Sequence, residues 1–264
     1  MKKVLKWFTL GLVAFLFGLV YTVPAHLATP YLPTQMHISG IGGTLWNGHV
    51  NNLELEGLKL GELQWRIQPL YLLLGRIKVD ARFHQTGLQG RGDVILGPHT
   101  LGFEDLHVSG DVDVVNPYIS AYGTTLDGEF KMDLGSLWIT QKGLEQSQGK
   151  LVLRNTQIIS PAELTLGDVQ IELAQKGETA VASLGNTGDT LRLSGTANIT
   201  PVWRYITNLR IVPTPSTPEE IRQTLTLLGR TDARGAVTLN NNGTIPILGW
   251  LPFLQHNEND KTGT

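Results

Sequence analysis

The side chains that could do chemistry are scattered through the sequence, and their spacings match no catalytic or metal-binding motif. Paired carboxylates can serve as general acid and base, and Asp111 with Asp113, or Asp127 with Glu129, alternate along strand-like stretches. The same alternation is typical of the solvated face of a strand, which is the simpler interpretation. Seven histidines occur, at positions 26, 37, 49, 84, 99, 107 and 256, and no two of them have the i, i+4 spacing of a helical metal site. The sequence therefore predicts no enzyme activity, no metal site and no cofactor.

The composition excludes several other classes of protein. The 264 residues carry a net charge of −2, which gives no electrostatic footprint for nucleic acid. The chain has no cysteine, so it contains neither a disulfide framework nor a zinc site of the usual thiolate kind. Its 30 glycines and 13 prolines, which follow no collagen-like period, indicate many turns between short strands.

The N-terminus predicts a membrane anchor at residues 5–23. This stretch is apolar apart from Lys6, and it is just long enough for a helix that crosses a bilayer. Lys2, Lys3 and Lys6 lie at its start and the next cation is Lys59, so residues 1–6 should stay in the cytoplasm and the rest should be exported. A cleaved signal peptide is the alternative, and it also exports everything from residue 30 onward.

The remainder of the chain predicts a mainly β protein with an antiparallel sheet and one short helix. Three prolines favour an extended neck over residues 24–36. Apolar residues then recur with period two, as in Leu63, Trp65 and Ile67, and this alternation continues through Val112 and Val114. The apolar block 69–75 interrupts it, either as a turn of helix or as a loop packed over the sheet.

An internal repeat predicts that the β body is divided into a first unit, 37–145, and a second unit, 146–250. The stretch 58–67, with its Gly-acid-apolar-Gln core, recurs without a gap as 164–173. The second unit contains the predicted helix 218–228, since Thr217 is a good N-cap and Pro218 suits the first helical position. A polar tail, 251–264, follows.

The turn formed by Gly43, Trp46, Asn47 and Gly48 is the candidate site. Its glycines allow positive φ, and Asn-Gly is a strong signal for a tight turn. Such a turn would hold the large ring of Trp46 at the start of the β body, close to the neck. The ring either packs into the first layer of the core or serves as an exposed anchor for a partner.

Taken together, the chain resembles the type II secretion system protein N family of the general secretion pathway. The residues that carry the resemblance are those of the turn 43–48, followed by 58–65, Pro69-Leu70 and 73–75. The resemblance implies a non-enzymatic, single-pass protein of the Gram-negative inner membrane with its C-terminal domain in the periplasm. Its implied partners are other secretion subunits and the membrane, with no small-molecule substrate.

A different class of function is handling of lipid or another hydrophobe. A sheet of repeated strands can present an apolar groove, and a closed core would give the same alternating pattern. The two differ in whether alternate residues such as Leu63, Trp65, Ile77 and Val79 face a packed interior or an open trough.

Overall fold

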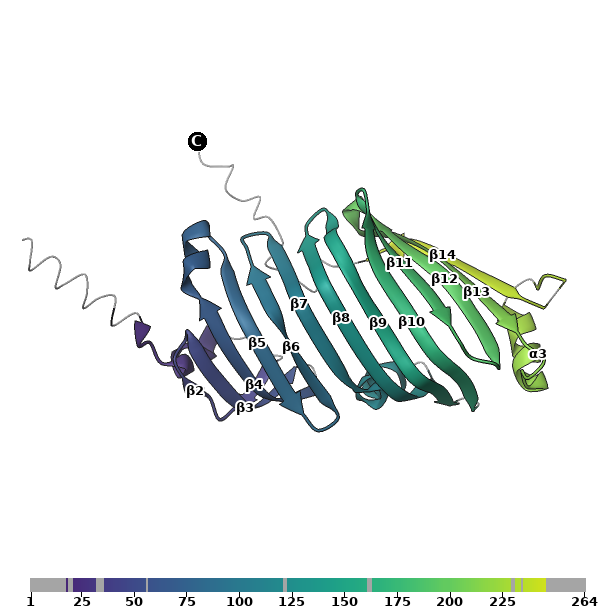
Figure 1. Ribbon diagram of the computed structural model, residues 1–264, viewed down its shortest axis with the longest axis horizontal. Helices are drawn as coiled ribbons and strands as arrows, with labels where there is room; N and C mark the ends of the chain where they lie inside the picture. The colour runs from purple at the N-terminus through teal and green to yellow at the C-terminus, as the bar shows by residue number, and fades with distance from the viewer. Residues whose placement is uncertain are drawn as a thin grey trace, which may run out of the picture. The chain divides into compact units, whose positions relative to one another are not determined.

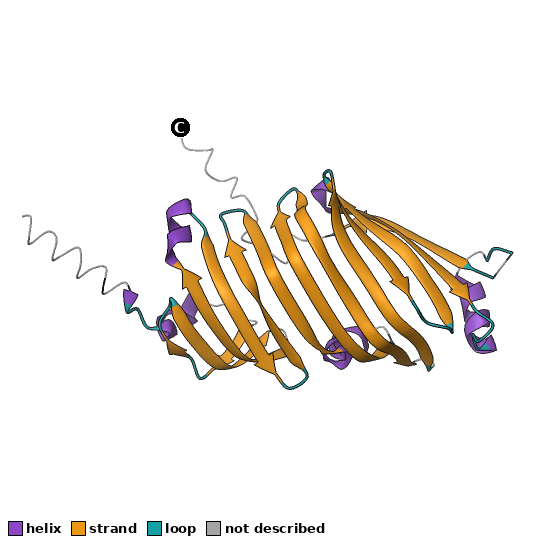
Figure 2. Cartoon of the chain, in the orientation of Figure 1, coloured by secondary structure: helices purple, strands orange, loops and turns teal. Residues whose placement is uncertain are grey.

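The computed structural model describes residues 18, 21–31, 36–55, 57–120, 123–160, 163–228, 231–233 and 235–245 (Figure 1). Its internal contacts divide the chain into two compact units that meet at Thr86 and Gly87. Antiparallel strands dominate the described part of both units and helices are few (Figure 2), which confirms the prediction of a mainly β, antiparallel fold. The division at 145/146, which was inferred from the repeat, stays a prediction.

The predicted anchor, residues 5–23, lies outside the described residues except for positions 18 and 21–23, and the tails 1–6 and 251–264 lie outside them entirely. Within the described ranges, no helix combines the length and the hydropathy that a membrane crossing requires.

The first unit contains a four-stranded antiparallel sheet in the order β1-β3-β4-β5, and the short strand β2 pairs with β3. Its elements in chain order are η1 (Ala25–Tyr31), β1 (Met36–Ser39), β2 (Gly42–Gly43), β3 (Asn47–Leu55), β4 (Leu58–Gln68), η2 (Pro69–Leu74) and β5 (Ile77–Gln85).

The neck is not extended as predicted, because its described part forms the 3-10 helix η1. Pro30 lies inside this helix. Proline fixes φ near −65°, which falls within the 3-10 range as well as the extended one, so the prolines do not distinguish the two conformations.

The second unit contains a nine-stranded antiparallel sheet in which every strand pairs with the next one along the chain, from β6 to β14. Its strands are β6 (Leu88–Leu96), β7 (Thr100–Asp111), β8 (Thr125–Thr140), β9 (Gly143–Ser160), β10 (Leu164–Lys176), β11 (Thr179–Asn186), β12 (Leu191–Thr200), β13 (Arg204–Pro213) and β14 (Val237–Thr244). Its helices are η3 (Val112–Val115), α2 (Asn116–Ile119), η5 (Pro201–Trp203) and α3 (Glu219–Leu228).

The predicted strand does not continue through Val112 and Val114, which lie in η3. Pro117 follows closely in α2 and has no N–H to donate to a ladder, so the chain leaves the sheet here. The side chain of Asn116 then holds the connection, since it donates to the Leu126 carbonyl at 2.8 Å and accepts from the Leu126 N–H at 2.9 Å.

The main hydrophobic cluster of the second unit lies between α3 and the sheet. Leu225 of α3 packs with buried residues of three strands, namely Leu164, Leu166, Val169, Leu191 and Val237. Helix α3 is therefore held against the sheet by Leu225, and Ile221 also packs against this cluster.

The repeated stretches share a local irregularity. Gly61 in β4 has a φ of 70° and Gly167 in β10 has a φ of 69°, and both lie where the strand register shifts. A left-handed glycine at such a shift is the usual form of a G1 bulge. Strands β4 and β10 also begin at the equivalent positions, Leu58 and Leu164. The predicted similarity of these two stretches thus extends to their backbone conformation.

Candidate functional site

The described residues contain no group of three His, Cys, Asp or Glu side chains that could hold a metal ion. The nearest approach to a catalytic arrangement is His107, whose Nδ1 lies 2.7 Å from Oδ1 of Asp133. This contact, followed by the Lys131 ammonium at 3.0 Å, holds the pKa of the Asp133 carboxyl below its usual value. Asp133 is therefore ionised at neutral pH and acts as a charge partner on an exposed strand face, not as a proton donor.

The predicted turn, residues 43–48, connects β2 to β3. Gly43 pairs with Gly48, and the chain reverses through residues 44–47. The Thr44 N–H donates to the Asn47 carbonyl at 2.9 Å, and the Asn47 N–H donates to Oγ1 of Thr44 at 3.1 Å. Asn47 and Gly48 thus begin β3, at the end of this turn.

Gly43 and Gly48 are needed for different reasons. Gly43 has a φ of 80°, which favours glycine. Gly48 has no such φ, and it is buried beneath the ring of Trp65 in β4, where a Cβ atom would lie 2.3 Å from Cζ2 of that ring. Nε1 of Trp65 donates to the Leu45 carbonyl at 2.9 Å, so the ring cannot easily move away. Gly48 therefore permits a close approach of a side chain.

The turn also fastens the neck to the first unit. The Leu45 N–H donates to the Val23 carbonyl at 2.8 Å, and Pro24 forms an isolated bridge with Thr44. On the other side, the Ile67 N–H donates to the Trp46 carbonyl at 2.7 Å. Ala25 is only 1% exposed. The segment that follows the predicted anchor is therefore docked on the sheet through main-chain hydrogen bonds.

Trp46 itself is half-buried. Its role as a core ring or as a partner anchor stays a prediction. The role of Trp65 was not predicted from the sequence. The available signal was a glycine in one strand and an aromatic residue in the next, because glycine in a strand often makes room for a close neighbour.

One face of the sheet in the second unit carries a half-buried apolar row across five strands. The register places its members opposite one another in β7 to β11, and they are Val108, Met132, Leu151, Ile171 and Leu184. Neighbouring strands lie about 4.8 Å apart, so the row spans about 19 Å. Val169, two residues before Ile171 on the same face, is 4% exposed in the cluster beneath α3, whereas every member of the row is only half-buried.

The last strand, β14, has β13 as its ladder partner. Its first residue, Val237, also forms an isolated bridge with Thr231. From Thr238 to Thr244, no second strand pairs with it among the residues that the structure describes. Asn240, Asn241 and Asn242 are all exposed. This strand is therefore an edge of the described sheet.

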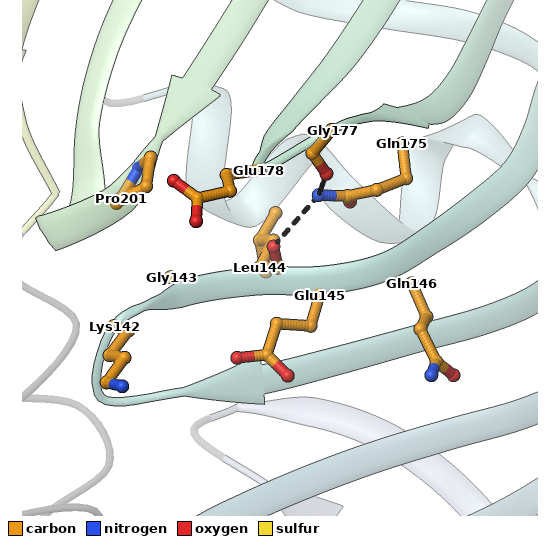
Figure 3. A pocket seen from close by; sticks show the side chains of 9 residues that line it. All are labelled: Lys142, Gly143, Leu144, Glu145, Gln146, Gln175, Gly177, Glu178 and Pro201. Carbon is orange, nitrogen blue, oxygen red and sulfur yellow. Dashed lines mark hydrogen bonds between the residues drawn. The ribbon is translucent and has the colours of Figure 1, made fainter.

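A depression of about 410 Å³ lies where the β8–β9 and β10–β11 turns approach Pro201 (Figure 3). The side chain of Gln175 reaches across it and donates to the carbonyls of Gly177 at 3.0 Å and Leu144 at 3.4 Å. Oε1 of Gln175 accepts from Oγ of Ser147 at 2.6 Å. The amide of Gln175 is therefore occupied by the protein itself.

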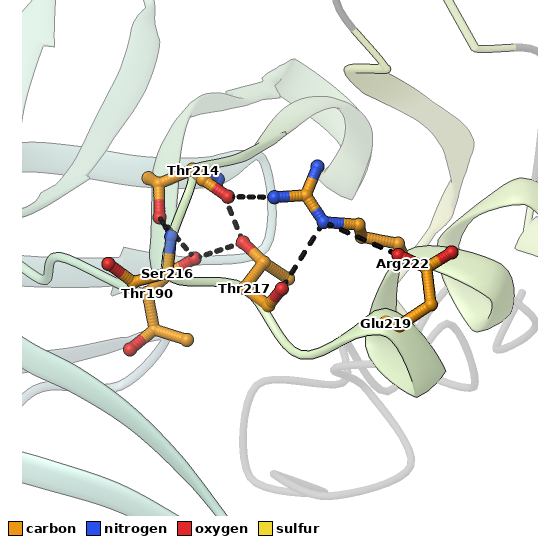
Figure 4. Close-up of polar contacts among 6 residues, drawn as sticks. All are labelled: Thr190, Thr214, Ser216, Thr217, Glu219 and Arg222. Carbon is orange, nitrogen blue, oxygen red and sulfur yellow. Dashed lines mark hydrogen bonds and ion pairs between the residues drawn. The ribbon is translucent and has the colours of Figure 1, made fainter.

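The loop before α3 is stabilised by a polar network (Figure 4). Oγ1 of Thr217 accepts from the Thr214 N–H at 2.8 Å and donates to the Thr190 carbonyl. Arg222 donates to the carbonyls of Thr214 and Thr217. Thr217 thus uses its hydroxyl to close the loop on β12, which fixes α3 over the sheet.

Comparison with known proteins identifies the machinery to which the chain is related. Residues 34–240 match the family model described as type II secretion system (T2SS), protein N. The chain is 27% identical to the type II secretion system protein N of Aeromonas hydrophila and 26% identical to that of Vibrio cholerae, over 93% of this chain and 100% of each relative. The protein N of Pectobacterium carotovorum is 25% identical over 84% of this chain and 90% of its own length. No solved structure matches the chain significantly.

We expect Gly48→Ala to lower the free energy of unfolding by about 1–3 kcal/mol, because the added methyl group collides with a tryptophan ring held in place by its own hydrogen bond. Gly185→Ala is the matched control, since Gly185 also lies in a strand and a Cβ there meets nothing within 4 Å. Denaturant unfolding of the purified full-length chain measures both. Equal stability of the two variants would show that Gly48 has no packing role.

Proposed function

Because the chain belongs to the type II secretion system protein N family, we propose that it is a non-enzymatic component of that machinery whose periplasmic β units bind other secretion subunits. In this proposal residues 5–23 cross the inner membrane once, and residues 1–6 remain in the cytoplasm. The uncharged run after Lys6 and the three lysines near its start support this topology.

The observation that carries the binding role is the edge of β14. Proteins usually protect such edges with lysine, with proline or with very short strands. The sequence of β14, Val-Thr-Leu-Asn-Asn-Asn-Gly-Thr, contains no charged residue and no proline, and the strand has eight residues. The outer strand of the first unit, β1, has only four residues. The edge of β14 is therefore the less protected one.

An extended segment of another subunit can add to this edge as a further strand. Main-chain hydrogen bonds then give affinity, at about 0.5–1.5 kcal/mol each, and side chains at alternate positions give specificity. The exposed asparagine side chains can form polar contacts with the added strand. Neither a cofactor nor a catalytic residue is needed for this role.

We expect a photo-crosslinking amino acid at Asn242 to capture another type II secretion subunit in the membrane of secreting cells. Glu172 is the matched control, because it is also exposed but lies in β10, four strands from β14 and thus about 19 Å away. Mass spectrometry identifies the adducts. If position 242 gives no subunit adduct, or gives the same adducts as position 172, then β14 is not the binding edge.

A second candidate function is handling of lipid or another hydrophobe, and the half-buried row from Val108 to Leu184 favours it. Four members of the row, Val108, Met132, Leu151 and Ile171, lie half-buried side by side and can accept an acyl chain, whereas Leu184 packs against the cluster beneath α3. Burial of each CH₂ group there would contribute about 0.8 kcal/mol.

Under this second function, Ile171→Asp should reduce the lipid that copurifies with the full-length chain by about tenfold or more, because an unpaired carboxylate against hydrocarbon costs more than about 1.4 kcal/mol. Thr165→Asp adds the same charge to β10 at an exposed position and should leave the lipid unchanged. Mass spectrometry of extracted lipid gives the amounts, and thermal unfolding confirms that both variants are folded. Equal lipid in both variants would rule out this row as the binding surface.

A further inference from the structure

The 3-10 helix η2 exposes a cluster of large apolar side chains at its tip. Leu70 is 75% exposed, Leu73 is 83% exposed and Leu74 is 73% exposed, and no residue of η2 is buried. The block is thus a turn of helix, one of the two predicted forms, but it does not pack over the sheet. Leucine side chains left in water across a contiguous surface mark a contact with a partner or a membrane.

The backbone of η2 holds this cluster in place without help from side-chain burial. Pro69 begins the helix, and Gly75 ends it with a φ of 68°. The Gly75 N–H donates to the Leu72 carbonyl at 3.0 Å, and the Arg76 N–H donates to the Tyr71 carbonyl at 3.1 Å. This is the closing pattern of a helix C-terminus, so the exposure of the leucines is a built feature of the turn.

Exposed apolar side chains are concentrated in the first unit. Of the twelve large hydrophobic residues that are exposed in the described part of the chain, eight lie before residue 87. They are Tyr21, Leu27, Leu55, Leu70, Leu72, Leu73, Leu74 and Ile77. The second unit is the larger one and has only four, so the concentration does not follow from size.

The position of η2 relates it to the predicted anchor. The Val23 carbonyl is bound by Leu45, and the carbonyl of the next residue, Trp46, is bound by Ile67 near the end of β4. Helix η2 begins two residues after Ile67. In the sequence, η2 therefore comes directly after the end of β4. That end of β4 is hydrogen-bonded to the turn that binds Val23, at the end of the predicted anchor.

The charges around η2 suit the surface of an anionic bilayer. Arg66 and Arg76 flank η2 and are exposed, and Asp80 lies opposite Arg66 in the paired strand β5. Lys78 is buried and its ammonium lies 5.3 Å from the centre of the Tyr71 ring, so this cation holds η2 against β5. Exposed leucines flanked by arginines are typical of segments that lie in the interface of a membrane.

From these observations we infer that η2 is a membrane-contacting wedge, whose leucines insert into the interfacial layer of the bilayer while the flanking arginines, Arg66 and Arg76, meet anionic headgroups. The inference rests on the proposed anchoring of residues 5–23 in the inner membrane. A second contact near the anchor would fix the orientation of the first unit on the membrane, which a single helix and a neck cannot do alone.

The absence of cysteine from the chain allows a direct test with single labels. The full-length chain with Leu73→Cys carries an environment-sensitive fluorophore and is reconstituted into vesicles of phosphatidylethanolamine and phosphatidylglycerol. Leu227→Cys is the matched control, because Leu227 is an equally exposed leucine, at 86%, in α3. Nitroxides carried on lipid tails report the depth of each label.

We expect the label at position 73 to shift to shorter wavelength and to be quenched several-fold more by lipid nitroxides than the label at position 227. Vesicles of phosphatidylcholine alone should reduce the difference. Equal emission and quenching at the two positions would overturn the inference. Shielding of position 73 in cells that contain the whole secretion machine, but not in vesicles, would also overturn it and would indicate a protein partner.

The test is independent of the proposed partner binding, because crosslinking at Asn242 is measured on the same chain. If position 73 remains in water while the Asn242 adducts persist, then the wedge is wrong and the binding role stands. If position 73 enters the lipid while the adducts are absent, then the wedge stands and the binding role fails.

Discussion

Backbone hydrogen bonds between sequential strands are the main interaction that stabilises each unit, because few side chains are fully buried. In the described residues only seventeen apolar side chains are buried, and six of them form the cluster beneath α3. The longest ladders, those of β8 and β9, run through a part of the sheet where the apolar row stays half-buried. Strand pairing is therefore the main source of stability there, and side-chain packing adds to it mainly where a helix covers the sheet.

This construction leaves three kinds of surface for binding. Part of a sheet face can keep its apolar side chains half-buried, as in the row that includes Ile171. A linear order of strands ends in an edge, as at β14. Hydrogen bonds made by main-chain atoms can also attach a segment that contributes little packing, as they do between Val23 and Leu45. Each surface suits contact with other molecules, which agrees with membership in a secretion machinery.

The sequence predicted the features that depend on side-chain pattern or on glycine. Period-two alternation located strands such as β4, the capping residues Thr217 and Pro218 located α3, and a repeated Gly61 and Gly167 marked equivalent bulges. It did not predict η1 or η3, because proline and valine fit more than one backbone conformation. It predicted the turn 43–48, but not that Gly48 makes room for the ring of Trp65. Nor could it separate an open face from a packed one, because alternation shows that a face is apolar and not what covers it.

Amide hydrogen exchange of the full-length chain tests most directly whether the strand ladder, and not a side-chain core, stabilises the second unit. If the ladder dominates, then the slowest exchange lies in β8 and β9, whose strands have sixteen and eighteen residues and a paired neighbour on each side. If the core beneath α3 dominates instead, then the slowest amides lie in β10, β12 and β14 around Leu164, Leu191 and Val237. That second result would contradict the account, since it would make the covered part of the sheet the stable part and the open part dependent on it.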